Sequence, residues 1–230
     1  MTKALMTVLA VSTVCSGLTW TVVSLTGNSA DAKPPASCSY TATGGRTSVG
    51  LPTFDAAAAS RPYTATLVTN RGDITFEALT QEAPCATTSF SFLAGKKYFD
   101  DSKCHRLTTR GIFVLECGDP DGKGTADPGY FFTDENLGGS KYTAGTVSMS
   151  KAVPGRNGSQ FFITYADPKV RMGPNWTTFG KVISGMDVLH EIADRGTADE
   201  STDGRPRKPV VIESVTVERA AAPTPGKSRD

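Results

Sequence analysis

Short apolar runs separated by turn residues dominate the chain from residue 63 onward. Leu67 and Val68 precede a polar turn at 70–73 and the alternating run at 74–78, a pattern that predicts a β-hairpin. Further strands are predicted on both sides of a connection at 108–111, and at 143–149, 160–165, 179–183 and 210–217. Helices are predicted from Pro84 to Gly95, where Pro fits the first turn and Gly the end, and over 187–193. The pattern predicts a mainly β domain, a closed antiparallel barrel capped by two helices.

The stretch from Gly155 to Ile163 is the most informative part of this pattern. Asn157 and Gly158 form a tight-turn pair because both tolerate positive φ, and strand-forming residues follow them at once. Neighbouring strand residues point to opposite faces, so Phe161 and Phe162 cannot share a side, and Gln160 lies on the side of Phe162. One aromatic ring can therefore fill a core while the other lines a surface pocket beside an amide. The alternative is a strand buried on both faces.

Composition and charge exclude several classes of function. The chain has 230 residues and a formal net charge of +1, which gives no electrostatic basis for binding nucleic acid or an anionic membrane surface. Its hydrophobic content of 38% fits one globular domain with extensions rather than a disordered chain. The run at 122–125 lacks the glycine spacing of a phosphate-binding loop, and no Gly-x-Ser-x-Gly elbow of a serine hydrolase occurs.

The N-terminus is typical of a targeting segment. Lys3 precedes a largely apolar stretch at 4–25, and Ala30-Asp31-Ala32 fits a small-x-small cleavage site. Residues 1–32 are therefore expected to be a signal peptide that is removed on export, which leaves a secreted or extracytoplasmic protein. The alternative is an uncleaved membrane anchor over 4–25. Residues 33–62 are rich in Pro, Ala and Ser and are expected to be a linker, the domain is expected at 63–219, and 220–230 to be a disordered tail.

Five blocks in order along the chain resemble the cyclophilins, the cyclosporin-binding class of peptidyl-prolyl cis-trans isomerases. The blocks are Cys-His-Arg-Leu at 104–107, Phe-Val-Leu-Glu-Cys-Gly-Asp at 113–119, Asp-Glu-Asn at 134–136, Gly-Thr-Val-Ser-Met at 145–149 and Phe-Gly-Lys-Val at 179–182. The resemblance spans roughly residues 65–217. The extra cysteines and the long N-terminal region are similar to those of an exported bacterial branch of the family. It implies an eight-stranded barrel, and a catalyst that needs no covalent chemistry, cofactor or metal.

The resemblance also assigns candidate site residues. Arg106 matches the family's catalytic arginine, and its alternative is an ordinary surface arginine. Gln160 matches a glutamine that contacts the substrate backbone. The proline pocket and the peptide-binding loop are matched by Phe113, Val114, Met149, Ser150, Lys151, Ala152, Phe162, Met172 and Trp176. For the apolar members of this set, the alternative is plain core packing.

The chain departs from the family pattern at two places. Glu116 stands where the family usually has a glutamine bonded to the catalytic arginine, so a cross-strand ion pair with Arg106 is expected. Arg171 or Met172 falls where many members have the tryptophan that supports cyclosporin binding. We therefore expect weak cyclosporin binding, whereas isomerase activity depends much less on that position.

Cysteine usage favours two disulfides. Cys15 lies in the signal peptide, and Cys38, Cys85, Cys104 and Cys117 remain, an even number in an exported chain. If Arg106 and Glu116 both face the site, strand alternation puts Cys104 on that face and Cys117 on the other, which disfavours a bridge between these two. Free buried thiols are the alternative. With two histidines and no Cys-x-x-Cys pair, a metal site or a thiol enzyme is not expected.

Two functions from different classes remain in competition. The first is a monomeric exported peptidyl-prolyl isomerase that acts on proline-containing peptides and on unfolded exported proteins. The second is a peptide-binding chaperone module on the same fold with little or no turnover, and Glu116 is the residue that keeps this reading open.

Overall fold

The computed structural model describes residues 37–45 and 47–219, which form three helices and twelve strands. The helices are α1 Ala56–Ala59, α2 Pro84–Gly95 and α3 Met186–Asp194. The strands are β1 Thr41–Ala42, β2 Tyr63–Thr69, β3 Ile74–Ala78, β4 Ser102–Lys103, β5 Arg106–Thr108, β6 Val114–Cys117, β7 Tyr130–Phe131, β8 Thr146–Met149, β9 Phe161–Thr164, β10 Thr178–Ser184, β11 Asp203–Gly204 and β12 Val211–Arg219. The predicted hairpin and both predicted helices are confirmed.

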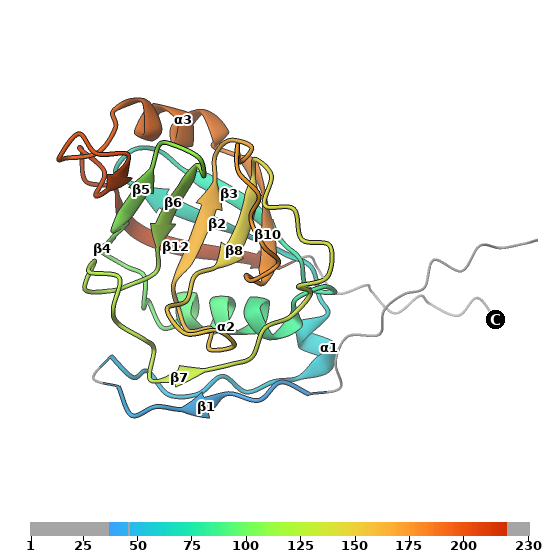
Figure 1. The fold of residues 1–230 in the computed structure, drawn as a ribbon. Coiled ribbons are helices and arrows are strands. Elements are labelled where there is room, and N and C mark those ends of the chain that lie inside the picture. The colour runs from blue at the N-terminus through green and yellow to red at the C-terminus, as the bar shows by residue number, and fades with distance from the viewer. Residues whose placement is uncertain (1–36, 46, 220–230) are drawn as a thin grey trace, which may run out of the picture. The chain divides into compact units, whose positions relative to one another are not determined.

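Ten of the strands form one antiparallel sheet that curls into a barrel (Figure 1). Their order is β11-β5-β6-β9-β8-β10-β3-β2-β12-β4, so β4 and β5 lie near opposite ends of the series. Only Cys104 and His105 separate these two strands along the chain, and the Cys104 N–H donates to the Val210 carbonyl at 2.9 Å. The chain thus closes the barrel by bending from β4 into β5. With β4 and β5 taken as one strand and β11 as an addition at the edge, the barrel has the eight strands that the resemblance implied.

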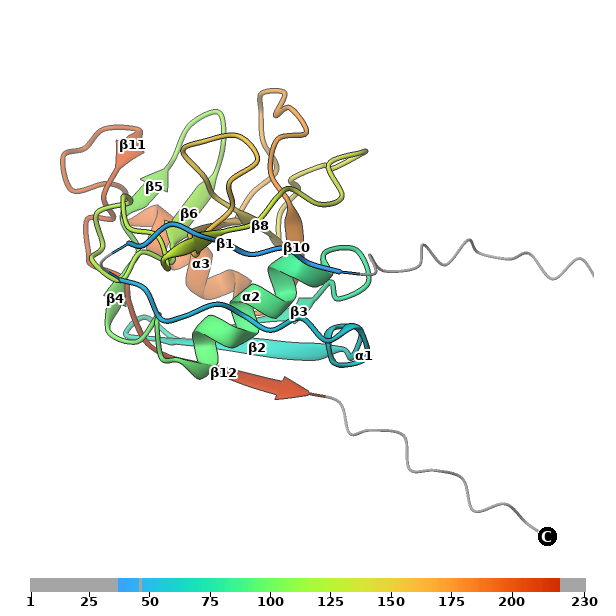
Figure 2. The same ribbon diagram turned by 90° about the horizontal axis from the view of Figure 1, so that it is seen from below.

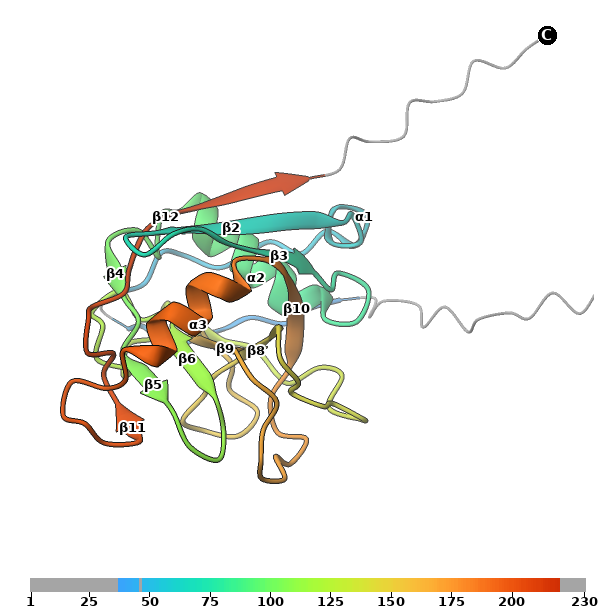
Figure 3. The same cartoon turned by 90° about the horizontal axis from the view of Figure 1, so that it is seen from above.

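The two longer helices cover the two ends of the barrel. α2 lies across the end seen in Figure 2, and α3 lies across the end seen in Figure 3. α2 begins at Pro84, whose missing N–H costs nothing in a first turn. The next two N–H groups, of Cys85 and Ala86, donate to the Glu135 carboxylate at 3.0 and 2.8 Å. These bonds satisfy donors that a helix start otherwise leaves without partners.

The main core fills the barrel between the helices. β2 alternates buried and half-buried residues, which puts Tyr63, Ala65 and Leu67 inside. Aromatic rings of the core pack edge-on, tilted or stacked at centroid distances between 5.0 and 6.3 Å, and they come from Phe76, Phe90, Phe99, Phe161 and Phe179. This rigid core fixes the strands whose outer face carries the candidate site.

The N-terminal stretch that composition marked as a linker packs on the domain over its described part. Cys38 and Cys85 form a disulfide that ties the chain to α2, and β1 pairs with β7. Tyr40 packs edge-on against Tyr130 and Phe132 at centroid distances of 5.6 and 5.7 Å. Composition suggested a linker because Pro, Ser and Gly are frequent here. One partly buried aromatic ring, one disulfide and a two-residue strand are enough to hold this stretch in place.

Cys104 and Cys117 form the second disulfide, with Cα atoms 4.0 Å apart, so the prediction that these two residues would not be bridged is wrong. Strand alternation applies only within a strand, and β5 begins at Arg106. Cys104 lies in the bend that closes the barrel, so its side chain turns inward to join Cys117 in the main core. The four cysteines therefore form two disulfides, as their even number indicated.

The expected signal peptide at 1–32 and the expected tail at 220–230 lie outside the described residues. Across the described part of the chain, no helix has the length and apolar character needed to span a bilayer. The alternative anchor at 4–25 falls outside the range that this observation covers.

Candidate active site

A row of four side chains crosses the outer face of the sheet. Arg106 on β5 pairs directly with Glu116 on β6, Glu116 pairs with Phe162 on β9, and Phe162 pairs with Ser148 on β8. Directly opposite residues share a face, and neighbouring strands lie about 4.8 Å apart. The register therefore puts a guanidinium two strands from an aromatic ring, with a carboxylate between them.

Phe162 belongs to an apolar cluster separate from the main core. Phe161 and Ile163 point into the barrel, whereas Phe162 packs with Val114 and Tyr142, and Ile112, Met172 and Trp176 add partly buried side chains. The prediction that Phe161 and Phe162 face opposite ways is confirmed. The Trp176 ring stands edge-on to Phe162 at a centroid distance of 5.9 Å. Val114, Tyr142 and Phe162 are buried, so the apolar surface open to a small ring comes from the partly buried Ile112, Met172 and Trp176 that pack on them.

Tyr142 supports this cluster and was not found by reasoning from the sequence. Its ring is edge-on to Trp176 at 5.4 Å, and its hydroxyl donates to the Trp176 carbonyl at 3.0 Å and accepts the Trp176 N–H at 2.9 Å. These contacts fix the position of Trp176 beside Phe162. No motif marked Tyr142, because its role depends on a loop 34 residues further along the chain.

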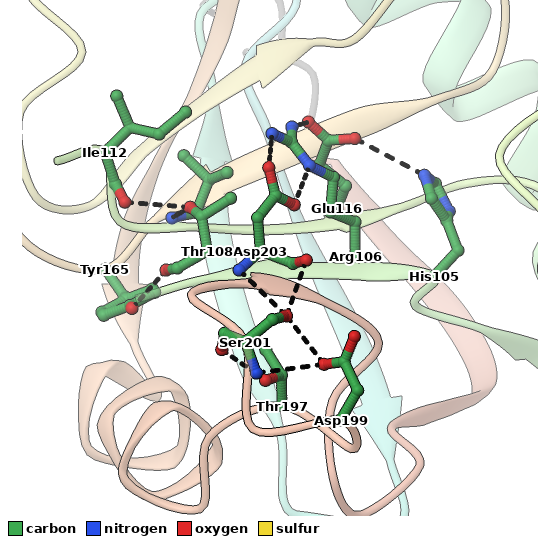
Figure 4. Close-up of polar contacts among 11 residues, drawn as sticks. His105, Arg106, Thr108, Ile112, Glu116, Tyr165, Thr197, Asp199, Ser201 and Asp203 are labelled. Atoms are coloured by element: carbon green, nitrogen blue, oxygen red, sulfur yellow. Dashed lines mark hydrogen bonds and ion pairs between the residues drawn. The ribbon is translucent and has the colours of Figure 1, made fainter. Parts of the chain in front are cut away.

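Two carboxylates hold the Arg106 guanidinium (Figure 4). Nη1 donates to Glu116 Oε1 at 2.6 Å, and Nε and Nη2 donate to the two Asp203 oxygens at 2.7 Å each. The Asp203 pair is bidentate, the geometry that matches a planar guanidinium fork. Three of the five N–H groups of Arg106 are thus engaged, which leaves one on Nη1 and one on Nη2 for another acceptor.

Asp203 is the main site residue that reasoning from the sequence missed. It lies on β11, which adds a two-residue edge strand to β5 with Asp203 opposite Thr108. The hydrogen bonds of Ser201 to Asp199 and to the Asp203 carbonyl hold this turn (Figure 4). The run 201–204, rich in Ser, Thr, Asp and Gly, signals a turn. Nothing local signals a partner for an arginine 97 residues away.

Charge pairing shifts the pKa values of all three groups. Hydrogen bonding to Asp203 raises the pKa of Arg106, and the bond from Arg106 lowers the pKa of Asp203. Burial alone would raise the pKa of Glu116, but bonds from His105 and Arg106 outweigh it and hold that pKa below its ordinary value. Both carboxylates are therefore ionised at neutral pH, and Arg106 is a cation held between two anions.

His105 completes the polar side of the site. Its Nε2 lies 3.5 Å from Glu116 Oε2, on the side of the carboxylate away from Arg106 (Figure 4). Its side chain is 8% exposed, and Nδ1 has no hydrogen-bond partner among the described residues. Glu116 is consequently anchored at both oxygens, and its position limits that of Arg106.

Gln160 lies at the edge of a cavity of about 410 Å³ that adjoins the row. Its Nε2 donates to the Ala126 carbonyl at 3.1 Å, which places the amide against the Gly-rich loop at 120–130. That loop is held by Asp119, a fully buried residue whose carboxylate accepts N–H groups from Asp121, Lys123, Thr125 and Ala126. Asp119 therefore positions the carbonyl that positions Gln160. Ser150, Lys151 and Ala152 also line the cavity.

Three of the expected site residues do not belong to the Phe162 cluster. Met149 is opposite Phe161 and belongs to the main core, because it points into the barrel. Phe113 precedes β6 and packs against Tyr165 at a centroid distance of 5.8 Å, on the side of the main core. Lys151 is buried, with its Nζ bonded to Asp134 and to the Asn175 carbonyl, so its charge supports the loop rather than a ligand. Val114, Phe162, Met172 and Trp176 do come together.

One group of side chains in residues 37–45 and 47–219 has the spacing of metal ligands. It consists of Cys38, Cys85 and Glu135. The two sulfur atoms are joined in a disulfide and offer no thiolate, so this group does not fit a metal.

Comparison with known proteins agrees with this geometry. Residues 64–217 match the family described as cyclophilin type peptidyl-prolyl cis-trans isomerase/CLD. The probable peptidyl-prolyl cis-trans isomerase B of Mycobacterium tuberculosis is 39% identical over 166 residues, which cover 66% of this chain and 53% of that protein. Peptidyl-prolyl cis-trans isomerase B of Streptomyces anulatus is 39% identical over 172 residues, 67% of this chain and 95% of that protein.

A solved structure shows the same fold. The crystal structure of a cyclophilin type peptidyl-prolyl cis-trans isomerase from Cryptosporidium parvum superposes with a TM-score of 0.60 at 28% identity, covering 70% of this chain and 99% of that one. The chain spans about half the length of the mycobacterial isomerase B relatives that it matches, 53% and 56%. From its matched residues, its barrel and the arginine beside an aromatic cluster, the chain belongs to the cyclophilin-type peptidyl-prolyl cis-trans isomerase family.

Proposed function

We propose that this protein catalyses rotation about X–Pro peptide bonds and thereby assists the folding of exported proteins. The observation that carries the proposal is the row on the outer face, in which the Arg106 guanidinium and the Phe162 cluster lie two strands apart. A proline ring can pack on the cluster while its amide nitrogen lies near the guanidinium.

The chemistry requires little more than these two groups. Rotation breaks amide resonance, against a barrier of about 18–20 kcal/mol, and uncatalysed exchange takes tens of seconds or more. In the twisted state the prolyl nitrogen regains a lone pair, which a hydrogen-bond donor can stabilise. A fixed donor of this kind favours the twisted amide over the planar one and so lowers the barrier.

The two carboxylates have opposite effects in this mechanism. They hold Arg106 in one orientation, so little reorganisation is needed when the substrate twists. They also draw charge away from the two N–H groups that remain for the prolyl nitrogen. Gln160, at the edge of the adjoining cavity, offers an amide for the backbone of the peptide.

The proposed setting is outside the cytoplasm. Two disulfides join the four cysteines that follow the expected leader, and disulfides persist in oxidising compartments. Proline-containing segments of unfolded exported proteins are the proposed substrates. A Cryptosporidium parvum relative, which is 28% identical, was crystallised in the presence of the dipeptide Ala-Pro, and this supports a proline-containing ligand.

A second candidate is a peptide-binding chaperone module with little turnover. The engagement of three of the five guanidinium N–H groups by carboxylates favours it, because a neutralised arginine is a weaker donor. Turnover separates the two candidates, since a binding module slows or leaves unchanged the exchange of the peptide to which it binds.

The test measures cis–trans exchange in an Ala-Pro peptide by exchange NMR, with the oxidised wild-type protein and with Arg106→Ala. The wild type should accelerate exchange, and the variant should lose about 10²-fold or more of the rate, as when an electrostatic donor is removed. Arg110→Ala is the matched control, because Arg110 is exposed on the turn after β5 and should leave the rate unchanged. Peptide binding without accelerated exchange would favour the chaperone module.

A further inference from the structure

A second cavity, of about 390 Å³, lies beside the row on the outer face. Three segments form it: residues 103–105 in the bend that closes the barrel, 121–123 of the Gly-rich loop, and residues 198, 205–207 and 209 of the turn before β12. These segments are far apart in the sequence, and the fold brings them together at one edge of the sheet. We call the cavity lined by these three segments the basic cavity.

The walls of the basic cavity are held by the fold. The Asp119 carboxylate fixes the loop at 121–123 through its bonds to backbone N–H groups, and Gly122 lies against the Lys103 side chain. On the other side, the Ala198 N–H donates to the Arg205 carbonyl and the Arg207 N–H donates to the Gly196 carbonyl, each at 2.9 Å. The cavity is therefore formed before any ligand arrives, which reduces the ordering cost of binding.

Positive charge is concentrated on this cavity. Four cationic side chains line it, from Lys103, Lys123, Arg205 and Arg207, and Asp121 is the carboxylate among the lining residues. Arg207 pairs with Glu200 at 3.2 Å, whereas among the described residues the other three cations make no ion pair. The whole chain carries a net charge of +1, so this is a local excess. Convergent cations at a concave surface attract anions, and arginine forks bind carboxylates with defined geometry.

The basic cavity adjoins the catalytic row. His105 lines the cavity, and its ring also lies 3.5 Å from Glu116, which pairs with Phe162. Arg205 follows β11 directly, two residues after Asp203. An extended polypeptide advances about 3.3 Å per residue, so a chain with its proline on the Phe162 cluster reaches the cavity within a few residues.

We infer that the basic cavity binds acidic side chains of the polypeptide substrate, at positions a few residues from the isomerised X–Pro bond. The inference rests on the proposed function and adds a substrate class to it. Beside the bond itself, the exposed carboxylate of Asp203 repels acids. The preference for acids is therefore confined to flanking positions.

The experiment uses four peptides with a central Ala-Pro, in which the four residues on the N-terminal or on the C-terminal side are all Glu or all Gln. Exchange rates are measured in low and in high salt. One Glu peptide should show a kcat/KM about three- to tenfold above its Gln partner in low salt, mainly through KM, and the gain should vanish in high salt. In the double variant Lys123→Gln/Arg205→Gln, kcat/KM should no longer be higher for the Glu peptide. Its kcat/KM for both Gln peptides should equal that of the wild type.

The matched control is Lys96→Gln/Lys181→Gln, which removes the same charge from exposed positions at the end of α2 and on β10. This control should keep the preference. Equal rates for Glu and Gln peptides, or a preference that survives in Lys123→Gln/Arg205→Gln, would overturn the inference. A Glu preference lost equally in both double variants would also overturn it, because it would then reflect net charge alone.

Two further measurements separate the possible sources of failure. In the first, binding of a fluorescent Glu-rich peptide without proline is measured by anisotropy. A loss of binding confined to Lys123→Gln/Arg205→Gln supports the cavity as an acid-binding site. If binding behaves in this way but no peptide is isomerised, the proposed function alone fails. Titration with inorganic phosphate tests a free anion. Saturable phosphate binding that these substitutions abolish, without any Glu preference, would assign the cavity to a small anion and overturn the peptide assignment.

Discussion

Asp203 should be a positioning residue for Arg106, and Asp203→Ala tests this directly. The substitution removes both bonds of the bidentate pair, at Nε and Nη2, and leaves the guanidinium with Glu116 alone. Arg106 should then sample further rotamers and hold its free N–H groups less firmly in one place. Its charge is retained, so any loss of rate reports orientation rather than removal of the donor.

The size of the effect follows from exposure. The Asp203 side chain is 55% exposed and that of Arg106 is 34% exposed, so solvent screens the pair strongly. We therefore assign it about 1 kcal/mol, the upper end for exposed ion pairs. That corresponds to a factor of about five in the population of the bound rotamer, so kcat/KM should fall about three- to tenfold. This is well below the loss expected for Arg106→Ala.

The assay compares wild type, Asp203→Ala, Asp203→Asn and Glu213→Ala by exchange NMR on one Ala-Pro peptide. Asp203→Asn keeps an acceptor for one N–H and should recover part of the rate. Glu213→Ala removes an exposed carboxylate from β12 and should match the wild type. A rate for Asp203→Ala within twofold of wild type would refute the positioning role. A faster rate would show that charge withdrawal by Asp203 outweighs the orientation that it provides.

Three other predictions follow from the same structure. Glu116→Gln should raise the exchange rate severalfold. The folded-state pKa of Glu116 is lowered, so the ionised carboxylate stabilises the fold at pH values above its unfolded pKa of about 4.3, and this stabilisation is lost as pH falls through the folded-state pKa. The free energy of unfolding of Glu116→Gln should therefore fall less than that of the wild type on acidification. An acid-unfolding transition identical to that of the wild type would contradict this. Cys104→Ala/Cys117→Ala removes a disulfide with a sequence separation of 13, and the freed unfolded chain gains entropy, so the free energy of unfolding in urea should fall by about 3 kcal/mol. A fall below about 1 kcal/mol would argue against this entropic contribution. Cyclosporin should inhibit weakly, because Met172 and Trp176 lie in the cluster and Arg171 is exposed where an indole is expected; stoichiometric inhibition at nanomolar protein would contradict this.

The strands that were predicted from the sequence include both strands with one buried face, such as β2, and the fully buried β9. β2, β3 and β12 are long enough for alternation or an apolar run to be visible. β1, β7 and β11 have two residues each, and two residues cannot display a period of two. These short strands form because the loops that carry them are held by contacts distant in sequence. Their existence is therefore a property of the tertiary structure.

The same distinction separates the predicted site residues from the missed ones. The relation of Arg106, Glu116 and Phe162 follows from alternation and register within strands, and the structure brings the three together. Met149 was assigned to the pocket by resemblance, although the same alternation puts it opposite Phe161 and inside the barrel. Asp203 and Tyr142 act across 97 and 34 residues from loops that carry no periodicity. Local patterns fix neither position.

The disulfide between Cys104 and Cys117 identifies the bend that assembles the site. Had alternation continued backward from β5, His105 and Arg106 would have pointed to opposite faces. In the structure both contact the Glu116 carboxylate, one at each oxygen. The chain breaks alternation at Cys104 because it must leave β12 and join β6, and the disulfide to Cys117 holds it there. One bend thus closes the barrel, turns Cys104 into the core and directs two consecutive side chains to one carboxylate. It follows that the disulfide supports the orientation of Arg106 as well as the stability of the fold, since the residue that it anchors lies two positions before the guanidinium.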